Sequence, residues 1–185
     1  MILARTFFQY LLGFGILLLM AGCLGKPDLS PTEDQPVYFQ YYYESAGRRG
    51  GWLIDQAGNI RQYDFYNYPH IFRRWSFPEN EGLTFRELQS NSLLARVIRG
   101  QVPDTEFTER KEWIAETSPD QLEESANASA DFHETFTTYI WDDDEERYQE
   151  VLLQQRGYYG DVDNPSKMAE EIVVWMKIVW DTYAQ

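Results

Sequence analysis

The sequence predicts an α+β domain: an antiparallel sheet of about five strands with helices packed on one face and a long C-terminal amphipathic helix. Three observations predict this class. Short runs of alternating apolar and polar residues, joined by glycine-containing turns, fill residues 37–65. Residues 132–141 are again rich in β-branched and aromatic side chains, with residues 147–155 expected as their partner strand, and residues 165–183 carry apolar side chains at helical spacing.

Composition limits the class of protein. The chain has 185 residues, with 16 Lys or Arg and 30 Asp or Glu, and a formal net charge of -14. Nucleic acid is therefore not expected as a partner. Because 43% of the residues are hydrophobic and 16% are aromatic, the chain can bury enough surface to fold, and residues 37–185 are predicted to form a single domain.

The first three predicted strands are residues 37–44, 52–56 and 60–65. Short turns can join only antiparallel neighbours, so these strands should form a meander. In the first strand the odd-numbered positions form the apolar face, and Tyr38 and Tyr42 lie on the opposite face.

The sequence pattern in the middle of the chain predicts helices. Thr84 and Glu87 form a capping box at the start of one helix, and Gly100 should end it. A second helix is expected at residues 105–116, and a short third one should open at residues 118–121.

The last predicted strands, residues 132–141 and 147–155, are joined by an acidic turn at residues 142–146, with a helix as the main alternative for the second strand. The final helix should be capped by Asn164, with Pro165 at its first position. This helix is expected to pack deeply against the sheet.

The N-terminus has the pattern of an export signal. Residues 1–22 hold one basic residue, Arg5, and no acidic one, and an apolar run ends in Ala21, Gly22 and Cys23. This pattern resembles the lipobox of bacterial lipoproteins, although Met20 stands where leucine is commonest in that class. The resemblance implies that residues 1–22 are removed and that Cys23 carries the lipid. The alternatives are an ordinary signal peptide followed by an unmodified cysteine, or a short uncleaved anchor.

Residues 23–36 contain three prolines among small and acidic residues and are predicted to be a linker. Because the residue after Cys23 is Leu24 rather than Asp, the lipoprotein rule implies the outer membrane in a Gram-negative host. In another bacterial host the protein would lie on the outer face of the plasma membrane. Removal of residues 1–22 takes away one basic residue and brings the formal charge to -15.

Few residues point to catalysis. The chain has two histidines, His70 and His133, without the spacing of a metal or triad site, and its one cysteine permits neither an intramolecular disulfide nor a cysteine-based zinc site. Residues 160–164 begin like a calcium loop but are better explained by helix capping. No metal and no cofactor are predicted. Glycosidases need only two suitably separated carboxylates, so a glycan hydrolase stays open.

The candidate partner-binding residues are acidic and aromatic. The acidic run could attract a basic protein, could bind calcium, or could form a solvated hairpin tip; it consists of Asp142, Asp143, Asp144, Glu145 and Glu146. Tyr38 and Tyr42 could form an exposed aromatic platform for a protein or a glycan, or a helix could cover them.

The sequence therefore favours a lipid-anchored cell-envelope protein that binds a partner, for example an inhibitor or neutraliser of a basic envelope protein. An envelope hydrolase acting on glycan is the first alternative, and a structural subunit of an envelope complex is the second. A cleft with two nearby carboxyl groups would favour the hydrolase, and a flat acidic or aromatic face would favour binding.

The first prediction concerns Cys23. Replacing Cys23 by Ser should abolish incorporation of labelled fatty acid and release the protein from the membrane fraction, because the thiol is the expected attachment point. Expression in a bacterium followed by labelling and fractionation measures both effects. A variant that is labelled and processed like the parent would contradict the lipoprotein assignment.

Overall fold

The computed structural model of the protein describes residues 38–78, 82–117, 122–125 and 131–184, which belong to one compact unit spanning Pro31–Gln185. The strands are β1 (Phe39–Ser45), β2 (Arg48–Ile54), β3 (Asn59–Asp64), β4 (Val97–Gln101), β5 (Glu123–Ser125), β6 (Phe132–Asp142), β7 (Arg147–Gly157) and β8 (Asp161–Asp163). The helices are α2 (Pro69–Phe72), α3 (Phe85–Leu94), α4 (Asp104–Ile114) and α5 (Lys167–Tyr183).

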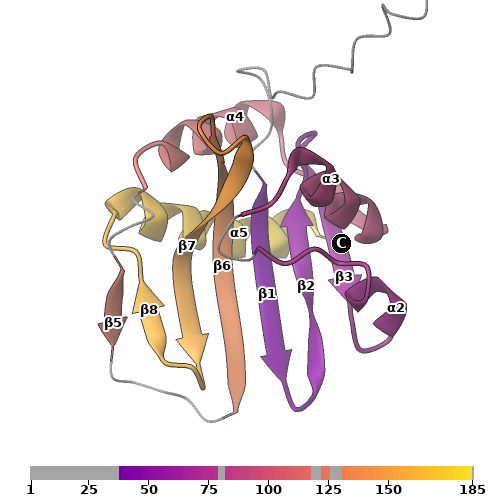
Figure 1. Cartoon of the computed structure of the whole chain (residues 1–185). Helices are drawn as coiled ribbons and strands as arrows, with labels where there is room; N and C mark the ends of the chain where they lie inside the picture. Colours follow the sequence, from indigo (N-terminus) through magenta and orange to yellow (C-terminus); the bar gives the residue numbers. More distant parts are fainter. Residues whose placement is uncertain (1–37, 79–81, 118–121, 126–130, 185) are drawn as a thin grey trace, which may run out of the picture. The chain divides into compact units, whose positions relative to one another are not determined.

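The strands form one antiparallel sheet in the order β4-β3-β2-β1-β6-β7-β8-β5 (Figure 1). The predicted meander is confirmed as β1–β2–β3, and the predicted hairpin as β6–β7. The predicted number of about five strands is wrong, because the described residues form eight. The additional strands, β4, β5 and β8, are short and lie toward the two edges of the sheet, where a few paired residues suffice.

The helix predicted to run as far as Gly100 ends earlier. The capping box is present, since Thr84 accepts a hydrogen bond from the Glu87 backbone and Glu87 accepts one in return, but α3 stops at Leu94. The next residues form β4 and pair with β3. Val97 and Ile98 are β-branched, so their side chains are compatible with a strand as well as with a helix. Pairing with the neighbouring strand β3 selects the strand.

The other elements agree with the expected types, with small changes at their ends. Residues 147–157 form a strand rather than the alternative helix, and α4 is close to its predicted position. The predicted start of the short third helix, residues 118–121, lies outside the described residues, but Glu123–Ser125, which would continue that helix, form strand β5 instead. The prediction that Asn164 caps the final helix, with Pro165 at its first position, is wrong. The cap is Ser166, whose hydroxyl accepts from the Met168 backbone, and Asn164 accepts from the Ser166 backbone in the turn before it.

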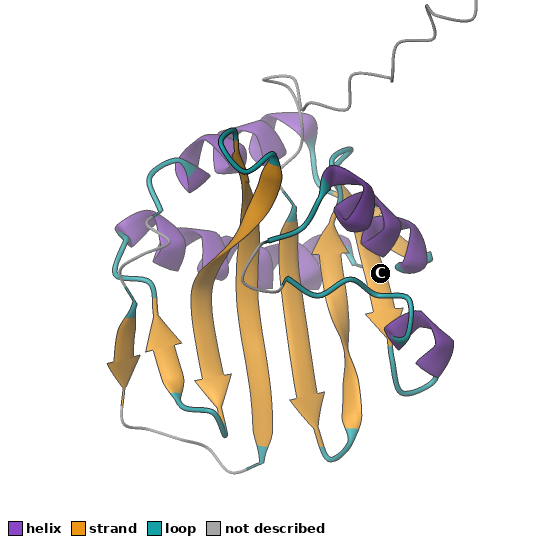
Figure 2. Ribbon diagram, viewed as in Figure 1, coloured by secondary structure: helices purple, strands orange, loops and turns teal. Residues whose placement is uncertain are grey.

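Helices cover both faces of the sheet, so the prediction that they pack on one face is wrong (Figure 2). On the α5 face, α4 and α5 pack on side chains such as Phe39, Ile54 and Val151. On the α3 face, α2, α3 and the loop around them cover Tyr38 and Tyr139. Successive residues of a strand point to opposite faces, and in β1 both sets are large enough to need cover.

Helix α5 lies deep against the sheet, as predicted. The Trp175 ring meets the Phe39 ring edge-on at a centroid distance of 4.9 Å, and its indole N–H donates to Glu106 Oε1 at 2.6 Å. These contacts fix α5 to β1 and α4 together. Within the described residues, no helix has the length and apolar character needed to cross a membrane.

Replacing Trp175 by Ala should lower the free energy of unfolding by about 3 to 5 kcal/mol, because the ring is only 4% exposed and its removal leaves a cavity. Urea unfolding monitored by circular dichroism measures the loss. The matched control is Val174→Ala on the outer side of α5, where the side chain is 52% exposed and the change should stay within about 0.5 kcal/mol. A loss below about 1 kcal/mol for Trp175→Ala would contradict this packing.

Candidate functional site

A cleft with a volume of about 540 Å³ opens on the α5 face, between the sheet and the last turns of α5. We call it the aromatic cleft. Four strands and one helix contribute its lining residues: Tyr41 and Tyr43 from β1, Gly51 and Trp52 from β2, Gln62 from β3, Glu134 and Phe136 from β6, and Lys177, Trp180 and Asp181 from α5.

Aromatic rings form the floor and one wall of the cleft. Tyr41 and Tyr43 are two residues apart on β1, so both point to the α5 face. The Tyr41 ring centroid lies 4.8 Å from that of Phe136, while the Trp180 ring of α5 stacks on the Trp52 ring at 5.4 Å. The rings support one another, so the surface they present is already in place without a ligand.

The carboxylates of the cleft come from a strand and from a helix. The Tyr41 hydroxyl donates to Glu134 Oε2 at 3.1 Å. Burial, and then the nearby Glu134 carboxylate, raise the pKa of Tyr41 well above its usual range, so this hydroxyl keeps its proton and remains a donor. Asp181 lies on an exposed turn of α5 and lines the same cleft.

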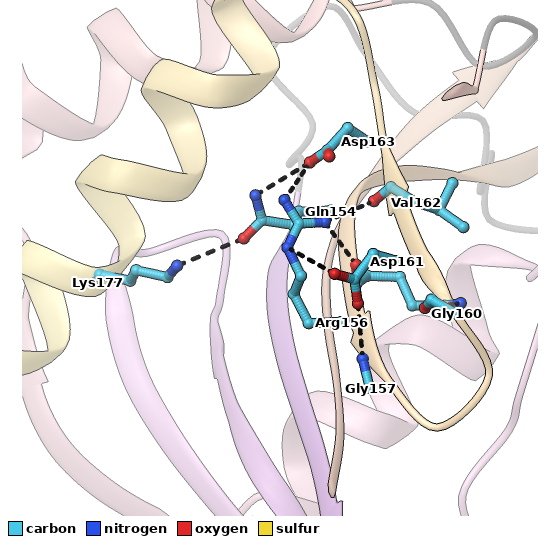
Figure 3. Close-up of polar contacts among 9 residues, drawn as sticks. Gln154, Arg156, Gly157, Gly160, Asp161, Val162, Asp163 and Lys177 are labelled. Atoms are coloured by element: carbon cyan, nitrogen blue, oxygen red, sulfur yellow. Dashed lines mark hydrogen bonds and ion pairs between the residues drawn. The ribbon is translucent and has the colours of Figure 1, made fainter. Parts of the chain in front are cut away.

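A cation of the protein already lines the cleft. The Lys177 ammonium sits 4.9 Å from the centroid of the Phe136 ring and donates to Gln154 Oε1 at 3.4 Å. Gln154 is held in turn by Asp163, whose Oδ1 accepts from its amide at 3.2 Å (Figure 3). Lys177 is therefore positioned both by an aromatic face and by an ordered amide.

The residues that resemble a calcium loop hold Arg156 instead. Arg156 Nη2 lies 2.6 Å from Asp163 Oδ1, and its Nε lies 4.0 Å from Asp161 Oδ2 (Figure 3). Asp161 also accepts from the Gly157 backbone. Among the residues that the structure describes, no group of three or more His, Cys, Asp or Glu side chains could hold a metal ion.

The acidic run forms the tip of the β6–β7 hairpin. Asp142 Oδ1 accepts from the backbone of Asp144 at 2.9 Å and of Glu145 at 3.2 Å, which closes the turn. Asp143 accepts from the indole of Trp141 at 2.8 Å. Asp143, Asp144, Glu145 and Glu146 are exposed, so their charges face solvent as a hairpin tip requires.

The two tyrosines predicted as an aromatic platform differ in accessibility. Tyr38 is 1% exposed and belongs to the core of the α3 face, so an exposed platform at this residue is ruled out. Tyr42 is half-buried, and its hydroxyl donates to Glu44 at 3.0 Å. Neither residue lines the aromatic cleft, which uses Tyr41 and Tyr43 from the same strand instead. The sequence assigned those two positions to the core, and nothing local distinguishes a core tyrosine from one at a cleft.

The two histidines do not meet. His70 is an exposed residue of α2, whereas His133 of β6 is buried among the rings of Tyr42, Tyr158 and Tyr159. Burial lowers the pKa of His133, and the nearby Glu44 and Glu134 only partly oppose this shift. His133 is therefore a buried imidazole that packs among aromatic rings. Among the described residues, no carboxylate forms a catalytic triad with it.

Glu150 is the described carboxyl group with the most altered pKa. It lies on β7 opposite Tyr139 of β6. Although the residue as a whole is exposed, burial of its carboxyl group raises the pKa to about 7, against hydrogen bonds to Thr137 and Tyr139 that lower it. His133 is six positions away along β6 from the partner of Glu150, roughly 20 Å, so the two groups do not form one site.

Comparison with protein families, with curated proteins and with solved structures finds no match to this chain. The geometry of the described residues therefore carries the functional inference.

The altered pKa of Glu150 predicts a pH dependence of stability. Its folded-state pKa of about 7 lies above the ordinary value of 4.5, so the folded protein binds more protons between these values and this residue lowers stability as the pH rises through that window. Replacing Glu150 by Gln should remove that contribution, so the variant should gain stability relative to the parent at pH 7.5 but not at pH 4.5.

Urea unfolding of both proteins at several pH values measures the difference. Glu170→Gln, on the exposed side of α5, is the control, and its difference from the parent should not vary in the same way. Equal pH profiles for the parent and Glu150→Gln would show that the pKa of Glu150 is not raised.

Proposed function

We propose that the domain binds a basic protein partner, and that the partner inserts a positively charged side chain into the aromatic cleft. The observation that carries this proposal is the position of Lys177, whose ammonium lies 4.9 Å from the centroid of the Phe136 ring. A ring face attracts a cation through its quadrupole, and a nearby carboxylate adds charge attraction. Tyr41, Tyr43 and Trp180 offer further rings beside Glu134 and Asp181.

The charge distribution supports a basic partner. Residues 104–185, which supply α5, β6 and the acidic hairpin, contain 21 acidic and six basic residues. A surface of this sign accelerates the approach of a cationic protein, and the hairpin tip is the most concentrated part of it. In this proposal the hairpin carboxylates steer the partner, and the aromatic cleft retains it.

The proposed setting is the bacterial cell envelope. A lipid on Cys23 would hold the protein at a membrane, in the outer membrane if the host is Gram-negative. Cys23 and the linker that follows it lie outside the described residues. An inhibitor or neutraliser of a basic envelope protein fits both the anchor and the acidic surface.

A glycan hydrolase is the second candidate, and one observation favours it. Glu134 and Asp181 come from different elements yet line the same cleft, as the two carboxylates of a glycosidase do. Aromatic rings at a cleft can also contact the apolar faces of sugars. The difference between the two functions is chemical, because only the hydrolase must break a glycosidic bond.

A kinetic experiment tests the binding proposal. Full-chain protein is immobilised, and association and dissociation of deca-lysine are followed at 20 mM and 150 mM salt, with Nε-acetylated deca-lysine as the uncharged probe of equal length. The parent should bind deca-lysine at least tenfold more tightly than the acetylated peptide, because acetylation removes the charge that the rings and carboxylates attract.

Two sets of variants separate steering from retention. Asn at positions 142–144 with Gln at positions 145 and 146 should slow association at low salt and leave dissociation nearly unchanged, because distant charges act mainly on encounter. Glu134→Gln with Trp180→Ala should instead speed dissociation about tenfold, since these residues would touch the bound cation. Glu170→Gln, an exposed carboxylate of α5 that does not line the cleft, is the control.

The same proteins are incubated with purified peptidoglycan, and released reducing ends are measured. Cleavage that disappears in both Glu134→Gln and Asp181→Asn would establish the hydrolase and overturn the binding proposal. Equal affinity for charged and acetylated deca-lysine would also overturn it.

A further inference from the structure

A second surface of the domain has the opposite charge. Residues 46–52, 66–78 and 95–103 contain six arginines and no acidic residue, although the chain as a whole carries a formal charge of -14. Contacts bring these segments together around α2: Arg48 faces the Tyr66 ring, Arg49 faces the Phe72 ring, and Arg96 lines one hollow with Tyr68 and His70. We call this surface the arginine patch, and its arginines are Arg48, Arg49, Arg73, Arg74, Arg96 and Arg99.

Exposed aromatic side chains lie among the arginines. Tyr66, Tyr68, Phe72 and Phe77 are between 39% and 61% exposed. The guanidinium of Arg48 lies 5.9 Å from the centroid of the Tyr66 ring, and that of Arg49 lies 6.0 Å from the centroid of the Phe72 ring. Arginines and exposed rings are therefore in direct contact at these two places.

The patch rests on a rigid base. Phe72 contacts Phe77 at 5.4 Å between ring centroids and the buried Phe65 at 5.3 Å. Phe65 in turn meets the buried Trp75 at 5.2 Å. Although Phe72 and Phe77 are exposed, each therefore also contacts the buried ring cluster.

A hollow of about 510 Å³ at the edge of the patch has a basic rim. Its lining includes Tyr68, His70, Arg96 and Arg99. The one carboxylate that lines it, Asp64, already accepts hydrogen bonds from the Tyr66 and Asn67 backbones at 2.9 Å. The hollow has a size and charge suited to an anionic headgroup.

Most of the charges of the patch are available to a ligand. Arg49 forms an ion pair with Glu44 at 2.8 Å, and Arg99 Nε donates to Gln62 Oε1 at 2.7 Å. Within the described residues, Arg48, Arg73, Arg74 and Arg96 have no ion-pair partner.

We propose that the arginine patch binds the surface of a bilayer that contains anionic phospholipid. Arginines near such a surface are attracted to the lipid phosphates, and Tyr and Phe side chains partition into the interfacial region. The phenyl rings of Phe72 and Phe77 favour a bilayer over a soluble polyanion, because a soluble polyanion offers them no apolar layer. Gln62 lines both the aromatic cleft and the hollow, but the proposal rests on the arginines and exposed rings and does not depend on the binding of a basic partner.

The uneven charge of the domain gives the binding a direction. Residues 38–103 contain eight basic and six acidic residues, whereas residues 104–185 are strongly acidic. An anionic membrane repels the acidic hairpin and attracts the arginine patch. The domain would therefore settle with the patch toward the lipid and leave its acidic hairpin free for a partner in solution.

Vesicle sedimentation of the full chain tests the proposal. Partition coefficients are measured on vesicles of pure phosphatidylcholine and of phosphatidylcholine with 30% phosphatidylglycerol. The apolar N-terminal run is present with both kinds of vesicle, so its contribution cancels in the ratio of the two coefficients. The ratio therefore reports the effect of the anionic lipid alone. For the parent the ratio should be large at 0.1 M salt and fall steeply at 0.5 M, where screening shortens the range of the attraction.

Matched variants identify the residues that cause the preference for anionic vesicles. Arg73→Gln with Arg74→Gln should lower the ratio roughly 25-fold, at about fivefold for each arginine near the membrane. Lys111→Gln with Lys167→Gln removes two positive charges from α4 and α5 and should change the ratio less than about twofold. Phe72→Ser with Phe77→Ser should weaken binding to phosphatidylglycerol vesicles at both salt concentrations, since it removes apolar contact rather than charge.

Circular dichroism confirms that each variant is folded before it is compared. A ratio near one for the parent, or an equal fall for the arginine pair and the lysine pair, would overturn the proposal. Tight binding to soluble polyphosphate with no preference for phosphatidylglycerol vesicles would also overturn it, and would assign the patch to a soluble anion instead.

Discussion

The antiparallel pairing of β1 with β6 is the contact on which the rest of the structure depends. It joins two parts of the chain that are about a hundred residues apart, with Tyr41 opposite Phe136 and Tyr43 opposite Glu134. The Thr138 hydroxyl adds a buried hydrogen bond to the Tyr38 carbonyl at 3.1 Å. Without this pairing the meander and the C-terminal hairpin would be separate sheets, and the aromatic cleft, which takes residues from both, would not exist.

Burial on both faces of β1 explains why helices lie on both sides of the sheet. The side chains of Phe39 and Tyr38 are neighbours in sequence and point in opposite directions, yet both are almost fully buried. Helices α4 and α5 cover one face, and α2 with α3 covers the other. The cover of the α5 face leaves a gap beside the last turns of α5, and Tyr41 and Tyr43 reach the surface there.

Acidic and basic residues are concentrated in different parts of the chain, and in the folded domain they lie on different elements. The acidic C-terminal part supplies α5 and the β6–β7 hairpin, whereas the arginines of the N-terminal part gather around α2. The two proposed interactions therefore use different chemistry on different elements. Aromatic side chains serve both, because a ring face can hold a cation and can also partition into a lipid interface.

The sequence by itself determined the antiparallel α+β class, the meander, the capping box at Thr84, the acidic hairpin and the deep packing of α5, since each depends on local periodicity or on a cap. Only the tertiary structure decided the number of strands, the helices on both faces, the burial of Tyr38 and the conversion of residues 97–101 from helix to strand. The aromatic cleft also depends on the tertiary structure, because strand register and helix placement bring Tyr41, Glu134 and Trp180 together. Local pattern reports which face a side chain occupies, and long-range packing decides what covers that face.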